Sequence, residues 1–562
     1  MIRFATTSRR AALASTAVLV LALAGCSDDG DTFDISTQMG PDPVLPEPSQ
    51  DLLPDLKVAE VVGWGDNETP DVIDGFTITA YARDLANPRT VHTLPNGDVL
   101  VVQSKAPPGK PVERPKDVIR DFIMSIASGS GGDDKPTNLI TLLRDTDRDG
   151  TVDERHDILT DLNSPFGLAF ADDTLYVAAA DAVLAYDYQL GQNEITTPPR
   201  VLTPLPGGPI NHHWTKDLAL SPDGRFLYAS VGSNSNAGER GLEAEKGRAA
   251  IWQIDRDTGA SRVYASGLRN PNGLVFNPES GALWTVVNER DELGPNLVPD
   301  YMTSVQDRGF YGWPWSYFGQ HVDPRLHPPR PDMVEQAIKP DYALSSHVAA
   351  LGLAFSMGMA MPQDYANGAF VGNRGSWNRD HFNGYKVLFV PFENGMPTGE
   401  PRDVVTGFLN ADEEARGRPV GVGFDGTGAL LIADDAGNTV WRLAADGAEP
   451  LASPIGTDQM PPGSPVATEQ ATAGDAVEGA PTAPVDGASP AAAGDTPAPT
   501  PDGTTPTAPA EDPALAPTPE APANTGDGTL APPTPPQTDV PATGPEGAVQ
   551  DATPPASAPT QP

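Results

Sequence analysis

Six short polar segments recur along the middle of the chain, each just before a short apolar run. They are Asn87–Arg89, Asn163–Gly167, His212–Thr215, Arg269–Gly273, His347–Gly352 and Arg416–Gly421. Arginine and histidine are frequent in these segments. Planar guanidinium groups match carboxylates or phosphates through paired hydrogen bonds, and a neutral histidine can accept a proton near pH 7. If the segments met in space, they would form a cleft for an anionic ligand with a proton acceptor beside it.

The elements that would position these segments are short strands joined by tight turns. Each turn precedes an apolar or β-branched run, and the turns are Pro95–Asp98, Asp172–Asp173, Pro222–Gly224, Glu279–Gly281, Asn367–Gly368 and Gly426–Gly428. Gly, Asp and Asn at such places favour hairpins. About six units of this kind predict an all-β fold, a six-bladed β-propeller whose blades turn their innermost strands toward a central channel.

In such a propeller the polar segments would begin the innermost strands and meet as a ring at one mouth of the channel. The side chains expected in this ring are Arg89, Asn163, His212, His213, Arg269, Asn270, His347, Arg416 and Arg418. Each residue alone also fits a structural role, either as part of a charged surface turn or as a buried histidine. Recurrence at one equivalent position is what favours a functional site.

The two ends of the chain differ from the repeat region. Residues 1–26 are typical of a bacterial lipoprotein signal, because basic residues precede an apolar run that ends in Leu23-Ala24-Gly25-Cys26. A plain cleaved signal with a chance cysteine is the alternative. We expect residues 27–70 to be a linker and residues 71–447 to be the propeller. Residues 448–562 are rich in Pro, Ala, Thr and acid, which predicts a disordered tail.

These ends predict an exported protein that is lipidated at Cys26 and attached to a membrane through that lipid alone. Ser27 favours the outer membrane of a Gram-negative bacterium over retention at the inner membrane, so we expect a periplasmic or outer-membrane location. Cys26 is the only cysteine, which excludes disulfides and a Cys-x-x-Cys-His haem motif. The net charge of −40 argues against nucleic acid as a partner.

Several longer segments occur in an order that is specific to one family. They are Gly267–Pro271, Val287–Gly294, Pro299–Tyr301, Tyr311–Pro314, Gly375–Arg379 and Gly417–Gly421. In these segments the chain resembles the soluble glucose/sorbosone dehydrogenases, and in particular their sorbosone-dehydrogenase-like branch, over roughly residues 74–444. That family uses pyrroloquinoline quinone (PQQ) and calcium on a six-bladed propeller.

The resemblance implies roles for particular residues. His213 corresponds to the catalytic base of the family, and Arg269 and Asn270 correspond to the pair that contacts the quinone. Arg416 and Arg418 match the paired arginines that hold the quinone carboxylates. The remaining correspondences are His347 as a second acid–base group, Arg374 in place of a family histidine, and Asn163 as the polar group nearest to a family glutamine.

Two places are expected to bind calcium. The resemblance points to the backbone carbonyls of Arg290 and Asp291. A second candidate is Asp145, Asp147 and Asp149, whose spacing follows the opening of a calcium loop. Position twelve of that loop is His156 rather than Glu, so an acidic hairpin turn is the alternative reading.

The resemblance therefore implies a PQQ- and calcium-dependent dehydrogenase that oxidises an aldose, sorbosone or a similar small sugar. Its electrons would pass to a separate soluble or membrane acceptor. Two alternatives stay open. One is a calcium-dependent propeller lactonase, and the other is a carbohydrate-binding propeller without catalysis. Arg374 and the missing glutamine keep the binding propeller open as an alternative, and the missing glutamine leaves glucose itself in doubt as the substrate.

Overall fold

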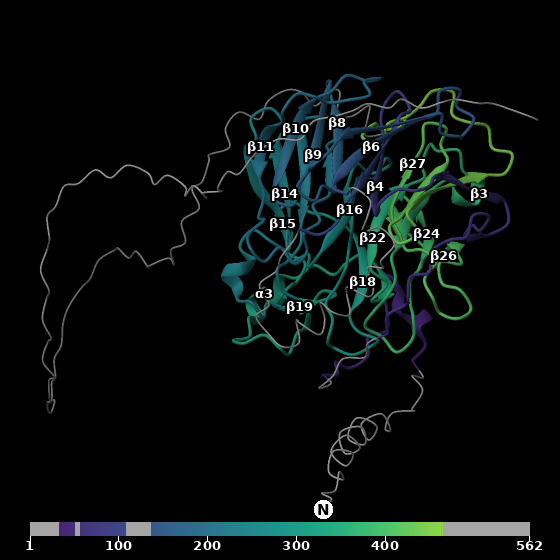
Figure 1. Cartoon of the computed structure of the whole chain (residues 1–562). Helices are drawn as coiled ribbons and strands as arrows, with labels where there is room; N and C mark the ends of the chain where they lie inside the picture. Colours follow the sequence, from purple (N-terminus) through teal and green to yellow (C-terminus); the bar gives the residue numbers. More distant parts are fainter. Residues whose placement is uncertain (1–32, 51–56, 108–136, 462–463, 465–562) are drawn as a thin grey trace, which may run out of the picture. The chain divides into compact units, whose positions relative to one another are not determined.

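The computed structural model describes residues 33–50, 57–107, 137–461 and 464, and it is a six-bladed β-propeller (Figure 1). Blade 1 contains β4 (Pro88–Thr93), β5 (Val99–Gln103), β6 (Leu139–Arg144) and β7 (Glu154–Leu159). Blade 2 contains β8 (Leu168–Ala171), β9 (Thr174–Ala178), β10 (Ala182–Asp187) and β11 (Arg200–Pro204). Blade 3 contains β12 (Leu218–Leu220), β13 (Phe226–Val231), β14 (Ala250–Asp255) and β15 (Ser261–Ser266).

The other three blades have the same antiparallel order. Blade 4 contains β16 (Pro271–Phe276), β17 (Leu283–Val287), β18 (Pro299–Ser304) and β21 (Tyr342–Ser346), with β1 (Met39–Gly40) added at its outer edge. Blade 5 contains β22 (Ala350–Phe355), β23 (Gly368–Asn373), β24 (Lys386–Glu393) and β26 (Arg402–Thr406), with β2 (Asp71–Val72) outside it and β25 (Met396–Pro397) paired to β24. Blade 6 contains β27 (Pro419–Phe424), β28 (Leu430–Asp434), β29 (Thr439–Ala445) and β3 (Phe76–Ala82).

Few elements lie outside the blades. A small hairpin of β19 (Ser316–Tyr317) and β20 (His321–Val322) precedes α3 (Pro331–Gln336), which is the one α-helix in the described ranges. Three short 3-10 helices are η1 (Ile35–Gln38), η2 (Leu242–Glu245) and η3 (Gln363–Tyr365). No helix in the part of the chain that the structure describes is long and apolar enough to cross a bilayer.

The ring is closed by strands from both ends of the propeller sequence. The innermost strands contact one another in the order β4, β8, β12, β16, β22 and β27, and β27 contacts β4 again. Strand β3 precedes every strand of blade 1 in the sequence, yet it pairs with β29 and completes blade 6. The predicted hairpin turns all fall between the first and second strands of their blades, which confirms the propeller expected from the repeat.

The core consists of six apolar clusters, one between each pair of neighbouring blades. Between blades 1 and 2, for example, Leu100 and Ile140 pack against Leu168 and Leu175. Both faces of each sheet are therefore covered, so that even second strands such as Val99–Gln103 are buried along their whole length. Burial on both faces fixes each blade rigidly beside the next and holds the loops at the channel mouth in place.

The segments before and after the propeller depart from the expectation of a free linker and tail. Gln38 is fully buried, β1 extends blade 4, and Trp64 packs edge-on against Phe408 and Trp441. At the other end, residues 451–461 contact the propeller through hydrogen bonds and the lining of its axial cavity. The predicted signal 1–26, with Cys26, and the tail from residue 465 onward lie outside the described residues.

A cavity of about 140 Å³ runs along the axis, and all six innermost strands line it. Residues Ile455–Pro461 also line it, although the sequence placed them in the tail. Thr457 exchanges hydrogen bonds with the backbone of Thr93, and Asp458 accepts one from the Phe170 amide. Asp458 also lies 3.1 Å from His92 Nε2. Short local bonds to two blades thus order a segment whose composition alone predicts disorder.

Candidate active site

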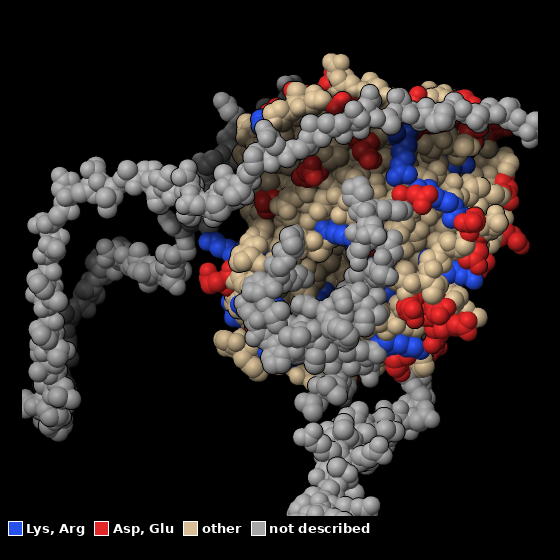
Figure 2. All heavy atoms as spheres, in the orientation of Figure 1, with Lys and Arg blue, Asp and Glu red and all other residues tan. Residues whose placement is uncertain are grey.

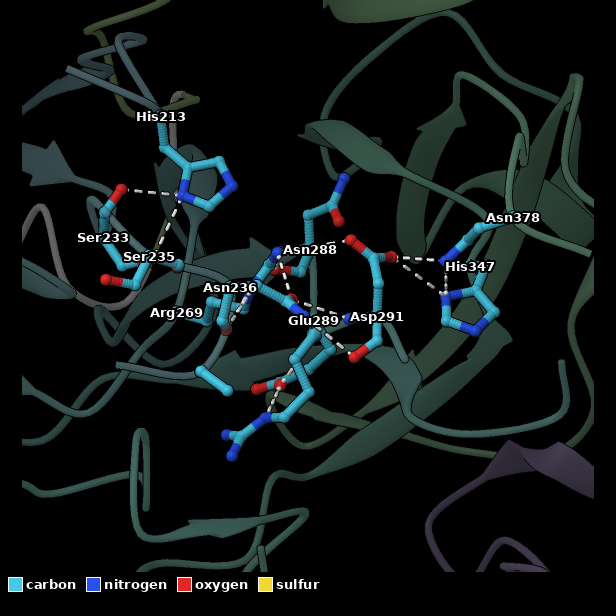
Figure 3. A network of polar contacts seen from close by, with 12 residues as sticks. His213, Ser233, Ser235, Asn236, Arg269, Asn288, Glu289, Asp291, His347 and Asn378 are labelled. Atoms are coloured by element: carbon cyan, nitrogen blue, oxygen red, sulfur yellow. Dashed lines mark hydrogen bonds and ion pairs between the residues drawn. The ribbon is translucent and has the colours of Figure 1, made fainter. Parts of the chain in front are cut away.

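The mouth of the propeller is made of two sets of loops. One set precedes the innermost strands, as expected. The other set follows the second strands, because antiparallel strands bring the start of one and the end of the next to the same edge of a sheet. His213 and Arg269 come from the first set, and Ser233, Asn236, Asn288 and Asp291 come from the second. Figure 3 shows these groups in one network, with Asp291 between the two histidines His213 and His347.

His213 is half-buried and held by its ring. Its Nδ1 lies 2.8 Å from the Ser233 carbonyl oxygen and 3.0 Å from Ser233 Oγ. A carbonyl can only accept, so Nδ1 carries the proton and Nε2 is the nitrogen able to take one up. Ser233 Oγ in turn donates to the Ser235 carbonyl at 2.6 Å. The tautomer that a general base needs is therefore built into the loop.

Arg269 is buried beside this histidine loop and is fully bonded. Its Nε and Nη2 donate to the backbone carbonyl and Oδ1 of Asn236 at 3.1 and 2.9 Å, and Nη1 donates to the Asn288 carbonyl at 3.1 Å. Asp291 Oδ2 lies 3.5 Å from Nη2. Burial lowers the pKa of the Arg269 guanidinium. The charges of Asp291, Glu289 and Asp300 oppose this effect and compensate the guanidinium.

Asn270 places a polar atom close to His213 and Gly232. Its Oδ1 is buried, and it has no hydrogen-bond partner among the residues that the structure describes. Gly232 faces it closely. A Cβ on Gly232 would lie 2.5 Å from both Asn270 Oδ1 and His213 Cβ. Any side chain at position 232 would clash with both residues, so a glycine is required for this close packing.

His347 lies on the other side of Asp291 and uses both ring nitrogens. Nε2 donates to the Gly294 carbonyl at 3.3 Å, and Nδ1 accepts from Asn378 Nδ2 at 3.1 Å. Asn378 Nδ2 also donates to Asp291 Oδ1. Burial, assisted by Arg379, lowers the pKa of His347 to about 3. This placement suits a neutral residue that orients Asp291 and Asn378, and its acid–base role stays a prediction.

A second cluster of basic side chains surrounds the carboxylate of Asp435. Arg89 Nη1 and Arg374 Nε both lie 2.8 Å from Asp435 Oδ2. Burial alone would raise the pKa of Asp435, but the charges of Arg374 and Arg89 hold it below its usual value. Arg89 also stacks over Trp214, the residue after His213, with 5.8 Å from its guanidinium carbon to the ring centroid.

Arg418 completes this group and is its least satisfied member. Its side chain is almost fully buried against the ring of Tyr385, 5.5 Å from the centroid. Within the described ranges its Nε and Nη2 have no hydrogen-bond acceptor. Burial lowers the pKa of the Arg418 guanidinium, and the charge of Arg374 acts in the same direction. Three guanidinium groups, those of Arg89, Arg374 and Arg418, thus lie near the two adjacent buried carboxylates of Asp434 and Asp435, which leaves an excess of positive charge.

Two of the predicted ring members lie elsewhere. Arg416 is half-exposed, 3.5 Å from Glu68, and stacks over Trp64. Asn163 is exposed, and its backbone carbonyl accepts from the Ala180 amide. The structure therefore brings His213, Arg269, Asn270, Arg374 and Arg418 to the mouth, whereas the side chains of Arg416 and Asn163 have other surroundings. Figure 2 shows basic side chains at the edge of a hollow in the viewed face, with acidic ones on its outer parts.

Calcium binding stays a prediction at both candidate places. At the first, the backbone carbonyls of Arg290 and Asp291 are the proposed ligands. The Asp291 carbonyl already accepts from Arg325 Nη1 at 2.8 Å and Asn236 Nδ2 at 3.0 Å. The Arg290 side chain is fully buried in ion pairs with Glu289 and Asp323, so only its backbone could face an ion.

The second calcium candidate lies in the hairpin between β6 and β7. One carboxylate oxygen from each of Asp145, Asp147 and Asp149 falls within 4.8 Å of the others. His156 lies on β7 and pairs with Glu154 at 3.3 Å. Because β6 runs away from the mouth, this hairpin is at the opposite end of its blade from the candidate active site.

Sequence reasoning missed the residues that hold the ring members. They are Ser233, Asn236, Lys216, Asn378, Tyr385 and Asp435. Most of them follow the second strand of a blade, where a polar residue comes soon after the apolar run in blades 3, 4, 5 and 6. That recurrence was the available signal, because the ends of second strands share an edge with the starts of first strands.

The fold and the site define the class of protein. It is a six-bladed propeller with a tautomer-fixed histidine and a cluster of buried guanidinium groups at the mouth of its channel. The TrAA12-like family model matches residues 135–303 and 332–446. The chain belongs to the TrAA12-like family.

Relatives of known structure share the propeller. A calcium structure of a family AA12 enzyme from Trichoderma reesei is 20% identical, with a TM-score of 0.54, and covers 70% of this chain and 99% of its own. The holo form of the PQQ domain of pyranose dehydrogenase from Coprinopsis cinerea is 20% identical, with a TM-score of 0.53, and the match covers 69% of this chain and 100% of that domain.

A relative was also found by sequence. An uncharacterised protein of Borreliella burgdorferi is 27% identical over 294 residues, which is 50% of this chain and 76% of that protein.

Proposed function

We propose that the protein is a PQQ- and calcium-dependent dehydrogenase that oxidises an aldose, sorbosone or a similar small sugar. The observation that carries this proposal is the pairing of His213, whose proton-accepting nitrogen is fixed as Nε2, with buried and under-compensated guanidinium groups at one mouth. A base beside a binding site for a flat polyanion is what such an oxidation requires.

The chemistry of PQQ fits the residues that are present. Its carboxylates need several cationic donors, and Arg418 offers two buried nitrogens without an acceptor in the described part of the chain. Arg89 and Arg374 add charge that Asp435 only partly balances. Asn270 Oδ1 is a further buried acceptor without a donor in the described residues, and buried polar atoms in proteins are rarely left without a hydrogen bond. These residues would hold and orient the cofactor, which is positioning rather than bond chemistry.

Held by Arg418, Arg89 and Arg374, PQQ with calcium would supply a two-electron oxidant for the hydride of the sugar carbon. His213 Nε2 would take the proton of the sugar hydroxyl, while the Ser233 carbonyl bonded to Nδ1 stabilises the imidazolium that forms. Arg269 and Asn236 would fix the wall of the pocket through their mutual bonds. One hydride and one proton leave the sugar, so its carbon is oxidised by two electrons.

Electrons would then leave for a separate acceptor, because the only cysteine is Cys26 and no haem-attachment motif is available. We also propose that the chain is exported and anchored through a lipid on Cys26, which would place the propeller beside acceptors of the periplasm or outer membrane. Labelling with a radioactive fatty acid should mark the wild-type chain and leave Cys26→Ser unlabelled.

The test of the enzymatic proposal uses the purified full-length chain. After incubation with PQQ and CaCl₂, it should reduce a redox dye when aldoses or L-sorbosone are added, and omission of PQQ should abolish dye reduction. Lactone hydrolysis without dye reduction would favour a calcium-dependent lactonase instead. Sugar binding with no PQQ uptake and neither activity would favour a binding propeller.

A further inference from the structure

Lys216 is a buried cation that the proposed reaction does not use. It directly follows the histidine turn and precedes β12, and its side chain is 0% exposed. Its Nζ lies 3.0 Å from the Trp214 carbonyl, 3.3 Å from the His213 carbonyl and 3.5 Å from the Thr215 carbonyl. Asn211 Oδ1 lies at 3.4 Å. Three successive carbonyls of the turn therefore converge on one ammonium group.

Burying a lysine side chain costs free energy that a purely structural residue need not lose. The hydrogen-bond partners of Lys216 Nζ in the described part of the chain are neutral oxygens. Burial lowers the pKa of Lys216 well below its usual value, the charge of Arg248 acts in the same direction, and the charge of Asp181 opposes them. A methionine would fill the same volume at no electrostatic cost. The free energy lost on burying Lys216 must be offset by its hydrogen bonds, because Nζ donates to four neighbouring oxygen atoms.

Arg248 holds the facing segment in the same way. Its Nη1 donates to the Gly232 carbonyl at 2.9 Å and one Nη2 bond runs to the Gly207 carbonyl at 3.0 Å. Nη2 also donates to Asn211 Oδ1, the acceptor that it shares with Lys216. Gly232 precedes Ser233, whose carbonyl fixes the His213 ring. Two buried cations therefore hold the two segments that meet at His213.

We propose that Lys216 is a positioning residue for His213: it clamps the carbonyls of residues 213–215 so that the imidazole keeps its place opposite Ser233. The inference rests on the proposed function for the role of His213, but the clamp itself does not. The other charged groups packed behind this turn are Arg248, Asp181, Glu245 and Asp217.

The first experiment observes His213 in the cofactor-free chain. The protein is labelled with ¹³C in its histidine rings, and the His213 signal among the 8 histidines is assigned with His213→Gln. In Lys216→Met the His213 signal should shift or broaden and its titration midpoint should change, because the turn that holds the imidazole against the Ser233 carbonyl loses its anchor. An unchanged signal and midpoint would overturn the proposal, whatever the enzyme does.

The second experiment separates positioning from stability. In the PQQ-loaded enzyme Lys216→Met should lower kcat about 10- to 100-fold while KM and PQQ affinity change little, as expected when a reacting group is displaced. Leu227→Ala, in the core between blades 2 and 3, is the matched control for lost stability. It should lower Tm and leave kcat near that of the wild type. Equal kcat losses in both variants would show that Lys216 acts only through stability.

The two experiments also distinguish this inference from the proposed function. If the wild-type chain reduces no dye, the proposed function fails, while the histidine titration still tests the clamp. If dye is reduced but the His213 signal is the same in the wild type and in Lys216→Met, the proposed function stands and the proposed clamp is wrong.

Discussion

Arg416 and Arg418 are two residues apart and have opposite surroundings: Arg416 pairs with Glu68 at 3.5 Å, whereas Arg418 is buried with two guanidinium nitrogens unbonded to any described residue. The family resemblance gives both arginines the same role. The structure separates them, because Arg418 stacks on Tyr385 next to the Arg89–Asp435–Arg374 group, while Arg416 stacks on Trp64.

This difference predicts unequal effects on cofactor binding. Arg418→Met removes donors that would bond to a carboxylate, and such charge-assisted bonds contribute about 1.5–3 kcal/mol each. PQQ affinity, measured by titration of the apoprotein and dye reduction, should fall roughly 10- to 100-fold. Arg416→Met is the matched control and should change affinity less than about threefold. Equal losses in the two variants would contradict the placement of the carboxylate site at Arg418.

His213 should be required for turnover and dispensable for cofactor uptake. His213→Gln removes the proton acceptor at Nε2, so kcat should fall about 10²- to 10⁴-fold, the usual contribution of a general base. PQQ uptake should persist, because the guanidinium group around Asp435 is intact. The check is dye reduction together with an absorbance titration of the quinone. Retained turnover in this variant would assign the proton transfer to another group.

His347 predicts how stability depends on pH. Its pKa is about 3 in the folded chain and about 6.5 when unfolded, so below pH 6.5 the unfolded state binds the extra proton. Stability from this residue is present above pH 6.5 and is lost as the pH falls toward 3, by about 2 kcal/mol between pH 6.5 and pH 5.

The measurement is the drop in Tm between pH 7 and pH 5. His347→Gln should show a smaller drop than the wild type. His381→Gln, whose ring is 67% exposed, should show the wild-type drop. A drop in His347→Gln as steep as in the wild type would mean that His347 titrates normally in the folded chain.

The segment 449–461 should stabilise the propeller. Truncation after Ala448 removes the bonds of Thr457 and Asp458 to blades 1 and 2 and opens the axial cavity to water. Tm should fall by several degrees, and binding of a hydrophobic dye should increase. Truncation after Ser464 keeps these bonds and should match the full-length chain. Identical melting of both truncations would show that the segment contributes nothing.

The fold could be predicted because its signals are local. Turns such as Asp172–Asp173 and Gly426–Gly428 specify hairpins from neighbouring residues, and their recurrence gives the blade number. The ordered terminal segments were missed because their contacts are long-range. Trp64 bonds to Asp434 and Asp458 to Phe170, and neither partner is visible in local composition.

The site was predictable only in part for the same reason. His213, Arg269 and Arg418 begin innermost strands, and the periodicity of the repeat places them at one mouth. Asp435 and Ser233 act across a loop or a blade boundary, so a pattern along one strand cannot reveal them. The split between Arg416 and Arg418 depends on packing against Trp64 and Tyr385, which lie far away in the sequence.

The most direct test of the central claim is a reconstitution of the full-length chain with PQQ and CaCl₂, followed by dye reduction over a panel of aldoses and L-sorbosone. The account predicts sugar-dependent dye reduction that needs PQQ, is abolished in His213→Gln and is weakened in Arg418→Met through a higher PQQ requirement. If PQQ does not bind to the wild-type chain, or if it binds and no sugar in the panel is oxidised, the assignment of this mouth as a sugar dehydrogenase site is wrong.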